Sequence, residues 1–142
     1  IEGFVAEVRR RLPDADVQRV DVDWTGRTAR RRCAPFMASV RPGERLGVFA
    51  CADTLAEGVY AAAADAGRGI PHDVLVVGFD DVRTARVLTP ALTSVHQPIR
   101  ELAAAAIGLL TRAAAGETLT PTATVLPTRL VVRGFGIEAP SG

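Results

Sequence analysis

Hydrophobic residues recur along the chain either at the spacing of an α-helix or as short continuous runs. At the start, Ile1, Phe4, Val5, Val8 and Leu12 share one helical face. Helical spacing returns over Thr25 to Met37, Thr54 to Ala66, and Pro98 to about Ala115, where Gly116 ends the pattern. Four helices are therefore predicted. We expect Pro35 to kink or shorten the second, and Thr54 with Glu57 to form a capping box at the third.

Short apolar runs between these helices predict β-strands. They cover Val17 to Val22, Leu46 to Cys51, Val74 to Phe79, and Val125 to Val132, while residues 92 to 97 are interpreted as a connector. Continuous apolar strands joined by helices are typical of a parallel sheet with both faces covered. The expected fold class is α/β, a three-layer sandwich with a parallel sheet, and Pro127 suggests that the last strand lies at an edge.

The composition is that of a globular protein. The chain has 142 residues, of which 48% are hydrophobic and 23% charged, enough for one domain or part of a larger one. Its formal net charge of +1 does not indicate a nucleic-acid or membrane partner. Cys33 and Cys51 lack metal-site spacing and suit a reducing compartment. Because the chain starts inside a helical pattern without methionine, we expect a fragment, with a disordered tail from Ala139 to Gly142.

Acidic residues and the single tryptophan follow three of the predicted strands. They are Asp23 and Trp24, Ala52 and Asp53, and Asp80 and Asp81. Carboxyl ends of parallel strands meet at one edge of a sheet, where ligands of such folds bind. An aromatic face beside several hydrogen-bond acceptors suits a sugar or a purine-like ring. We therefore expect an effector site that includes Trp24, Asp53 and Asp80.

Each of these residues also has a purely structural interpretation. Asp53 is as well suited to assisting a helix N-terminus as to contacting a ligand. One of Asp80 and Asp81 is expected to serve the turn, and Asp80 is favoured for the ligand. Trp24 has ordinary packing as its alternative. The arginine clusters 9–11 and 30–32 are interpreted as solvated helix faces.

Enzymatic interpretations find little support. His72 precedes a predicted strand and His96 lies in the predicted connector, and neither is placed beside a nucleophile. Gly67 to Gly69 follows a helix, which is the wrong context for a phosphate-binding loop. No cofactor or metal is expected. A small hydrolase using Asp80 and Asp81 remains the enzymatic alternative.

Two sequence blocks resemble the LacI/GalR family of bacterial transcription regulators. They are Asp73-Val-Leu-Val-Val-Gly-Phe-Asp-Asp81 and Leu88-Thr-Pro-Ala-Leu-Thr-Ser-Val-His-Gln-Pro98, and the second is most similar to purine repressors. Val48-Phe-Ala-Cys-Ala-Asp-Thr-Leu-Ala-Glu-Gly58 and Leu126-Pro-Thr-Arg-Leu-Val-Val-Arg133 extend the similarity over nearly the whole chain. The first two blocks together are specific, although either alone is weak.

The resemblance implies a fold and a role for the chain. It implies the C-terminal subdomain of a type I periplasmic-binding-protein-like effector domain in a cytoplasmic, dimeric regulator whose DNA-binding domain lies outside these residues. Trp24 and Asp80 fall at positions that contact the effector in the family. Ala52 replaces a frequent asparagine, which puts a lactose-repressor-like binding mode in doubt. The implied dimer interface contains Leu55, Val59, Ala62 and Val82.

The long helix after Pro98 raises a packing question. The resemblance implies that residues 98–121 cross to an N-terminal subdomain that this chain lacks. Its apolar stripe is Ile99, Leu102, Ala106, Ile107 and Leu110. We expect this helix to be swapped into another chain, to dock elsewhere or to be disordered, because a bare stripe favours association. The alternative function is a sugar-binding protein of an ABC-type uptake system.

Overall fold

Four strands form one sheet, and helices precede or connect them along the chain. The computed structural model describes residues 1–41, 43–120 and 123–134. The elements in sequence order are α1 (Glu2–Arg11), α2 (Gly26–Ser39), β1 (Leu46–Phe49), α3 (Asp53–Asp65), β2 (Val74–Asp80), α4 (Arg83–Val87), β3 (Thr93–His96), α5 (Ile99–Ala114) and β4 (Arg129–Val131). The strand order in space is β1-β2-β3-β4.

The sheet is mixed, with a parallel body and one antiparallel edge. β1 pairs with β2 and β2 with β3 in parallel, whereas β4 runs antiparallel to β3. The predicted α/β class is therefore confirmed, and β4 lies at an edge as Pro127 suggested. The predicted parallel sheet is present in β1, β2 and β3, and the edge strand β4 departs from it by running antiparallel.

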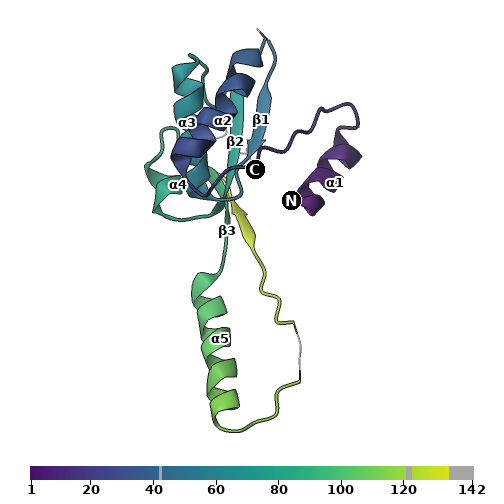
Figure 1. Ribbon diagram of the computed structural model, residues 1–142, viewed down its shortest axis with the longest axis vertical. Helices are drawn as coiled ribbons and strands as arrows, with labels where there is room; N and C mark the ends of the chain where they lie inside the picture. Colours follow the sequence, from purple (N-terminus) through teal and green to yellow (C-terminus); the bar gives the residue numbers. More distant parts are fainter. Residues whose placement is uncertain (42, 121–122, 135–142) are drawn as a thin grey trace, which may run out of the picture.

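One face of the sheet is covered by α2 and α3 (Figure 1). Val74 and Val76 of β2 are buried on this face, and α3 contributes seven buried residues. The two helices approach closely at Gly58, where an added Cβ would lie 2.1 Å from the backbone oxygen of Gly26. A residue without a side chain is what allows this packing.

The other face carries phenylalanine contacts with α1. The ring of Phe4 stacks on Phe49 of β1 at a centroid distance of 4.8 Å. Phe49 in turn meets Phe79 of β2 edge to face at 6.4 Å. No residue of α1 is buried, however, and Phe4 itself remains 43% exposed. The apolar face predicted for this helix is thus only partly covered.

The long helix α5 projects away from the sheet on two connecting segments (Figure 1). None of its 16 residues is buried. Ile99, Ile107 and Leu110 are 58%, 62% and 70% exposed. The helix is formed and does not bury its stripe on its own chain. Its exchange into another chain or its docking on another surface stays a prediction.

Two of the predicted strands differ from the observed ones. Val17 to Val22 forms no strand. Its polar residues bond locally instead, as in the 2.8 Å contact between Arg19 and Asp21, and Val22 packs against the core without joining the sheet. The predicted connector, in contrast, contains β3, which is central to the sheet.

The ends and caps of the helices differ from the predicted ones in smaller ways. α2 continues through Pro35 to Ser39, so Pro35 does not shorten it. The N-cap of α3 is Ala52 and not Thr54, and Glu57 accepts a hydrogen bond from Thr84 of α4 instead of closing a capping box. α3 ends at Asp65, one residue before the predicted end at Ala66.

Candidate functional site

The three parallel strands end at one edge of the sheet, where polar side chains gather. Asp80 is the last residue of β2 and His96 the last of β3, and the two are register partners. Asp53 opens α3 just beyond the end of β1. The expected convergence of acidic residues at this edge is therefore present for Asp53, Asp80 and Asp81.

The backbone turns sharply at Asp80 and Asp81. Their φ angles are 109° and 56°, in the left-handed region that residues with a Cβ rarely occupy. Such a conformation persists only where surrounding contacts hold it, and it is common at ligand sites. The turn sends the two successive carboxylates to different partners. Asp80 accepts a 2.5 Å hydrogen bond from the Gln97 side-chain amide.

Asp81 forms a buried ion pair with Arg133, which follows β4. The guanidinium donates to Asp81 Oδ1 at 2.5 Å, and His96 Nδ1 lies 3.0 Å from Oδ2. Burial raises the pKa of Asp81, but the bond and charge of Arg133, with His96 and Arg86 in addition, outweigh burial and hold the pKa below its ordinary value. Asp81 is thus a structural anion at neutral pH.

Asp53 is fully enclosed and ties three segments together. Its carboxylate accepts a 2.8 Å bond from the Val82 backbone N–H and a 2.6 Å bond from the Ser94 hydroxyl. Gly78 leaves room for it, since a Cβ there would lie 2.2 Å from Asp53 Oδ1. Burial raises the pKa of Asp53, and its two hydrogen bonds offset part of that effect. The N-cap position of its helix belongs to Ala52, so Asp53 joins α3 to β3 and to the turn before α4.

Trp24 lies in the loop that leads into α2 and is 73% exposed. Since Val17 to Val22 forms no strand, Trp24 does not follow a strand end. A Cβ on nearby Gly26 would lie 3.2 Å from the backbone oxygen of Thr54, which places this loop against the first turn of α3. Asp23 in the same loop binds the Thr25 hydroxyl at 2.6 Å, and Thr25 caps α2. No hydrogen bond joins Trp24 to Asp80 among the described residues.

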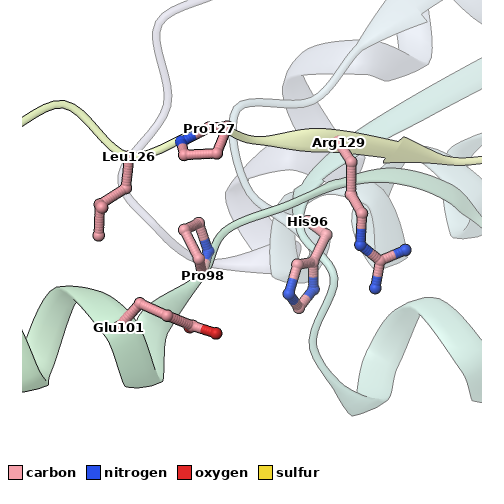
Figure 2. Close-up of a pocket in the computed structure, with 6 residues that line it drawn as sticks. All are labelled: His96, Pro98, Glu101, Leu126, Pro127 and Arg129. Atoms are coloured by element: carbon pink, nitrogen blue, oxygen red, sulfur yellow. The ribbon is translucent and has the colours of Figure 1, made fainter.

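A pocket of about 260 Å³ opens where the chain leaves β3 for α5 and returns to β4 (Figure 2). His96 and Arg129 are register partners on β3 and β4, and their side chains point to the same side. Glu101 of α5 reaches toward them. The apolar wall consists of Pro98, Leu126 and Pro127. The pocket combines both charges with apolar surface and adjoins the edge that carries Asp80.

The residues implied for the dimer interface occupy different environments. Leu55, Val59 and Ala62 are only 8%, 2% and 1% exposed and belong to the core. Val82 is 43% exposed. The three buried side chains pack in the core cluster with residues of α2 and the sheet, and the interface with a partner chain stays a prediction.

Four residues of this edge escaped the sequence interpretation, namely Ser94, His96, Gln97 and Arg133. Ser94, His96 and Gln97 were missed because residues 92 to 97 were interpreted as a connector and not as a strand. Arg133 is separated from Asp81 by 52 residues, and no local spacing connects the two. Within the described ranges, no cluster of His, Cys, Asp or Glu could hold a metal ion, and no helix is long and apolar enough to cross a bilayer.

Comparison with known protein families gives a match over nearly the whole chain. The family model of the periplasmic binding protein-like domain covers residues 2–134. The chain belongs to this family. Within the family, its relatives are LacI-type regulators, which confirms the resemblance carried by the Gly-Phe-Asp-Asp and Leu-Thr-Pro blocks.

Three relatives define this similarity. The HTH-type transcriptional repressor PurR of Edwardsiella ictaluri is 46% identical over 63 residues, covering 44% of this chain and 18% of the repressor. The ribose operon repressor of Halalkalibacterium halodurans is 40% identical over 87 residues, covering 61% and 26%. A LacI family transcriptional regulator from Arthrobacter sp., solved in complex with lactose, is 31% identical with a TM-score of 0.77, covering 93% of this chain and 49% of that structure. The chain thus spans about a quarter of one of those repressors, less of the other, and about half of the solved structure.

Proposed function

We propose that this chain is the effector-sensing part of a DNA-binding transcription regulator that works in the cytoplasm, and that it binds a sugar or a purine-like molecule. The observation that carries the proposal is Asp80, a carboxylate held in an unusual backbone conformation at the carboxyl end of a central parallel strand. A carboxylate offers more acceptor positions than the single Gln97 amide uses, so it can also accept from ligand hydroxyl or ring N–H groups.

The exposed indole of Trp24 is the second element of the proposed site. A large aromatic side chain that is 73% exposed beside the first turn of α3 is available to stack on a ring. Asp53 was expected to contact the effector as well. Because both its oxygens are engaged inside the protein, we propose that Asp53 supports the turn at Asp81 and Val82 instead of touching the ligand.

The relatives favour a regulator over the alternative of an uptake-system sugar-binding protein. The two curated relatives are named as repressors, and the solved structure of a LacI family regulator contains lactose. We propose that α5 and its connecting segments pack on a second subdomain, which together with this one encloses the effector. No enzymatic activity is part of the proposal.

A homodimer is proposed through the surface around α4. Val82 and Val87 are 43% and 62% exposed there, next to the exposed residues Thr54 and Glu57 of α3. Replacing Val87 with aspartate is expected to shift the full-length protein toward monomer in sedimentation experiments. A dimer of unchanged strength in Val87→Asp would contradict this interface.

The ligand site is tested by thermal shift and calorimetry on the full-length protein with D-ribose, lactose and hypoxanthine. For a probe that binds, Asp80→Asn is expected to weaken binding about tenfold to a hundredfold, because it removes a charged acceptor. Trp24→Ala should also weaken binding, whereas the exposed Asp14→Asn should leave it unchanged. Residues 1–142 alone should bind weakly. Tight binding by this half, or equal binding by Asp80→Asn, would contradict the proposal.

A further inference from the structure

The two aspartates at the end of β2 are consecutive, yet only one of them is accessible. Asp80 is half-buried at the edge, while the side chain of Asp81 is 2% exposed. Both have positive φ angles, which residues with a Cβ adopt only under constraint. The direction in which Asp80 presents its carboxylate therefore depends on whatever fixes Asp81.

The backbone N–H of Asp81 donates to Ser94 Oγ at 3.1 Å, and the carboxylate of Asp81 is held by Arg133. The side chain of Arg133 is 17% exposed and donates to Asp81 Oδ1 at 2.5 Å and to the Leu92 backbone oxygen at 2.9 Å. Its own backbone N–H binds Thr93 Oγ1 at 2.9 Å, so the residue is anchored at both ends. A guanidinium is charged at every physiological pH.

The other charged neighbours of Asp81 hold it less firmly. Arg86 lies 4.0 Å away and its side chain is 66% exposed, so solvent screens that charge. His96 lies 3.0 Å away but is 34% exposed and carries a charge only when protonated. Neither residue bonds both to Asp81 and to the backbone of the segment before β3.

We infer that Arg133 is a positioning residue for Asp80, the carboxylate proposed to bind the effector. By bonding to Asp81, Arg133 maintains the left-handed turn that presents Asp80 to the ligand and to Gln97. This inference rests on the proposed function, because Asp80 is the residue offered to the effector. The residue that bonds to Asp81 therefore comes from the segment that returns from α5 through β4. The direction of the Asp80 carboxylate thus depends on the segment that joins α5 to the sheet.

The side chain of Gln97 reports this geometry without any ligand. The chain has two glutamines, Gln18 and Gln97, and no asparagine, so its side-chain amide spectrum contains two NH₂ pairs. Gln97 donates to Asp80 at 2.5 Å at the edge of the sheet, while the exposed Gln18 donates locally to Asp16 at 2.6 Å. A Gln18→Glu variant assigns the pairs, and Gln18 serves as the internal reference.

The experiment compares the 142-residue chain with three variants by ¹⁵N NMR. In Arg133→Met, which adds no amide, the Gln97 pair is expected to move toward the position of the Gln18 pair. Its exchange with water should rise at least tenfold. Arg133→Lys, which keeps the charge, should show a smaller change. Arg68→Met is the matched control, because Arg68 is also half-buried and donates to the backbone oxygens of Met37 and Val40 at the opposite end of the sheet.

The inference is overturned if the Gln97 pair is unchanged in folded Arg133→Met, or if Arg68→Met moves it equally. Should Arg133→Met fail to fold, an unchanged pair in Arg133→Lys overturns it and a shifted pair supports it. For whichever of D-ribose, lactose and hypoxanthine binds, Arg133→Met should reduce affinity about tenfold in the parent protein. The same change should not reduce affinity further in the Asp80→Asn variant. A screen without binding would contradict the proposed function and leave the ligand-free result standing.

Discussion

Helices α3 and α5 resemble each other in sequence but not in surroundings. Both are rich in alanine, both contain one internal glycine, and both are followed by a glycine with positive φ, Gly67 and Gly116. Seven of the 13 residues of α3 are buried, whereas none of the 16 residues of α5 is. An apolar stripe at helical spacing therefore predicts that a helix forms, but it does not reveal whether its partner lies in the same chain.

The two internal glycines show the difference most directly. A Cβ on Gly58 of α3 would meet the backbone of α2 at 2.1 Å, while a Cβ on Gly108 of α5 would meet nothing within 4 Å. One glycine is required by close packing, and the other only adds backbone freedom to an exposed helix. Changes at these helices should therefore have opposite effects on stability.

The largest effect is expected for Gly58→Ala. Its methyl group can be accommodated only if α2 moves away from α3, so we expect a loss of about 3 kcal/mol or more in the free energy of unfolding. Urea denaturation followed by circular dichroism measures it. A variant within about 1 kcal/mol of the parent, near the scale of ordinary substitutions, would show that the helices do not pack this closely.

The next largest effect is expected from a comparison of one leucine in the core with one leucine on α5. Leu92 is fully buried and Leu110 is 70% exposed. Leu92→Ala should destabilise the chain by about 3 kcal/mol, because it removes buried surface and leaves a cavity. Leu110→Ala should change stability by less than about 0.5 kcal/mol. Equal losses in parallel denaturation curves would mean that α5 is covered in solution.

A third effect concerns the buried polar contacts of the body. Asp53→Ala leaves the Val82 N–H and the Ser94 hydroxyl without their acceptor and should cost about 2 kcal/mol. Asp53→Asn can accept from Val82 and donate to Ser94, so its loss should be smaller. Denaturation of both variants at pH 7 tests this ranking, and equal losses would contradict the assigned hydrogen bonds.

The raised pKa of Asp53 makes the stability difference between the parent and Asp53→Asn depend on pH. Its charged form is disfavoured in the folded state, so the resulting cost is present at neutral pH and disappears as pH falls through the folded pKa. The parent should therefore gain stability relative to Asp53→Asn on acidification. A difference that stays constant with pH would argue against a buried, charged Asp53.

The smallest effect is a gain. Gly108→Ala should stabilise α5 by about 0.5 to 1 kcal/mol, because alanine restricts the unfolded chain and fills open space. Helix content from circular dichroism and amide exchange rates in residues 99–114 measure it. Slower exchange is expected there, and a loss of helix would show that Gly108 packs against a partner.

The site was recognised from sequence only in part. Asp53, Asp80 and Asp81 were expected at one edge because each follows a strand or opens a helix, and the structure brings them together. Trp24 was expected there through a strand that does not form. Arg133 and Ser94 were missed because their contacts join residues 52 and 41 positions apart, which no local pattern encodes.

The sequence by itself determined helices α1, α2, α3 and α5, the apolar strands β1 and β2, and the α/β class, because the spacing of apolar residues reflects the geometry of one element; the short helix α4 was expected to be a loop. Only the tertiary structure decided that β3 replaces residues 17–22 in the sheet, that Arg133 pairs with Asp81, and that α5 is left uncovered. Strand pairing, ion pairs and helix contacts are formed between residues distant in the chain, and their energies depend on burial that a linear pattern does not contain.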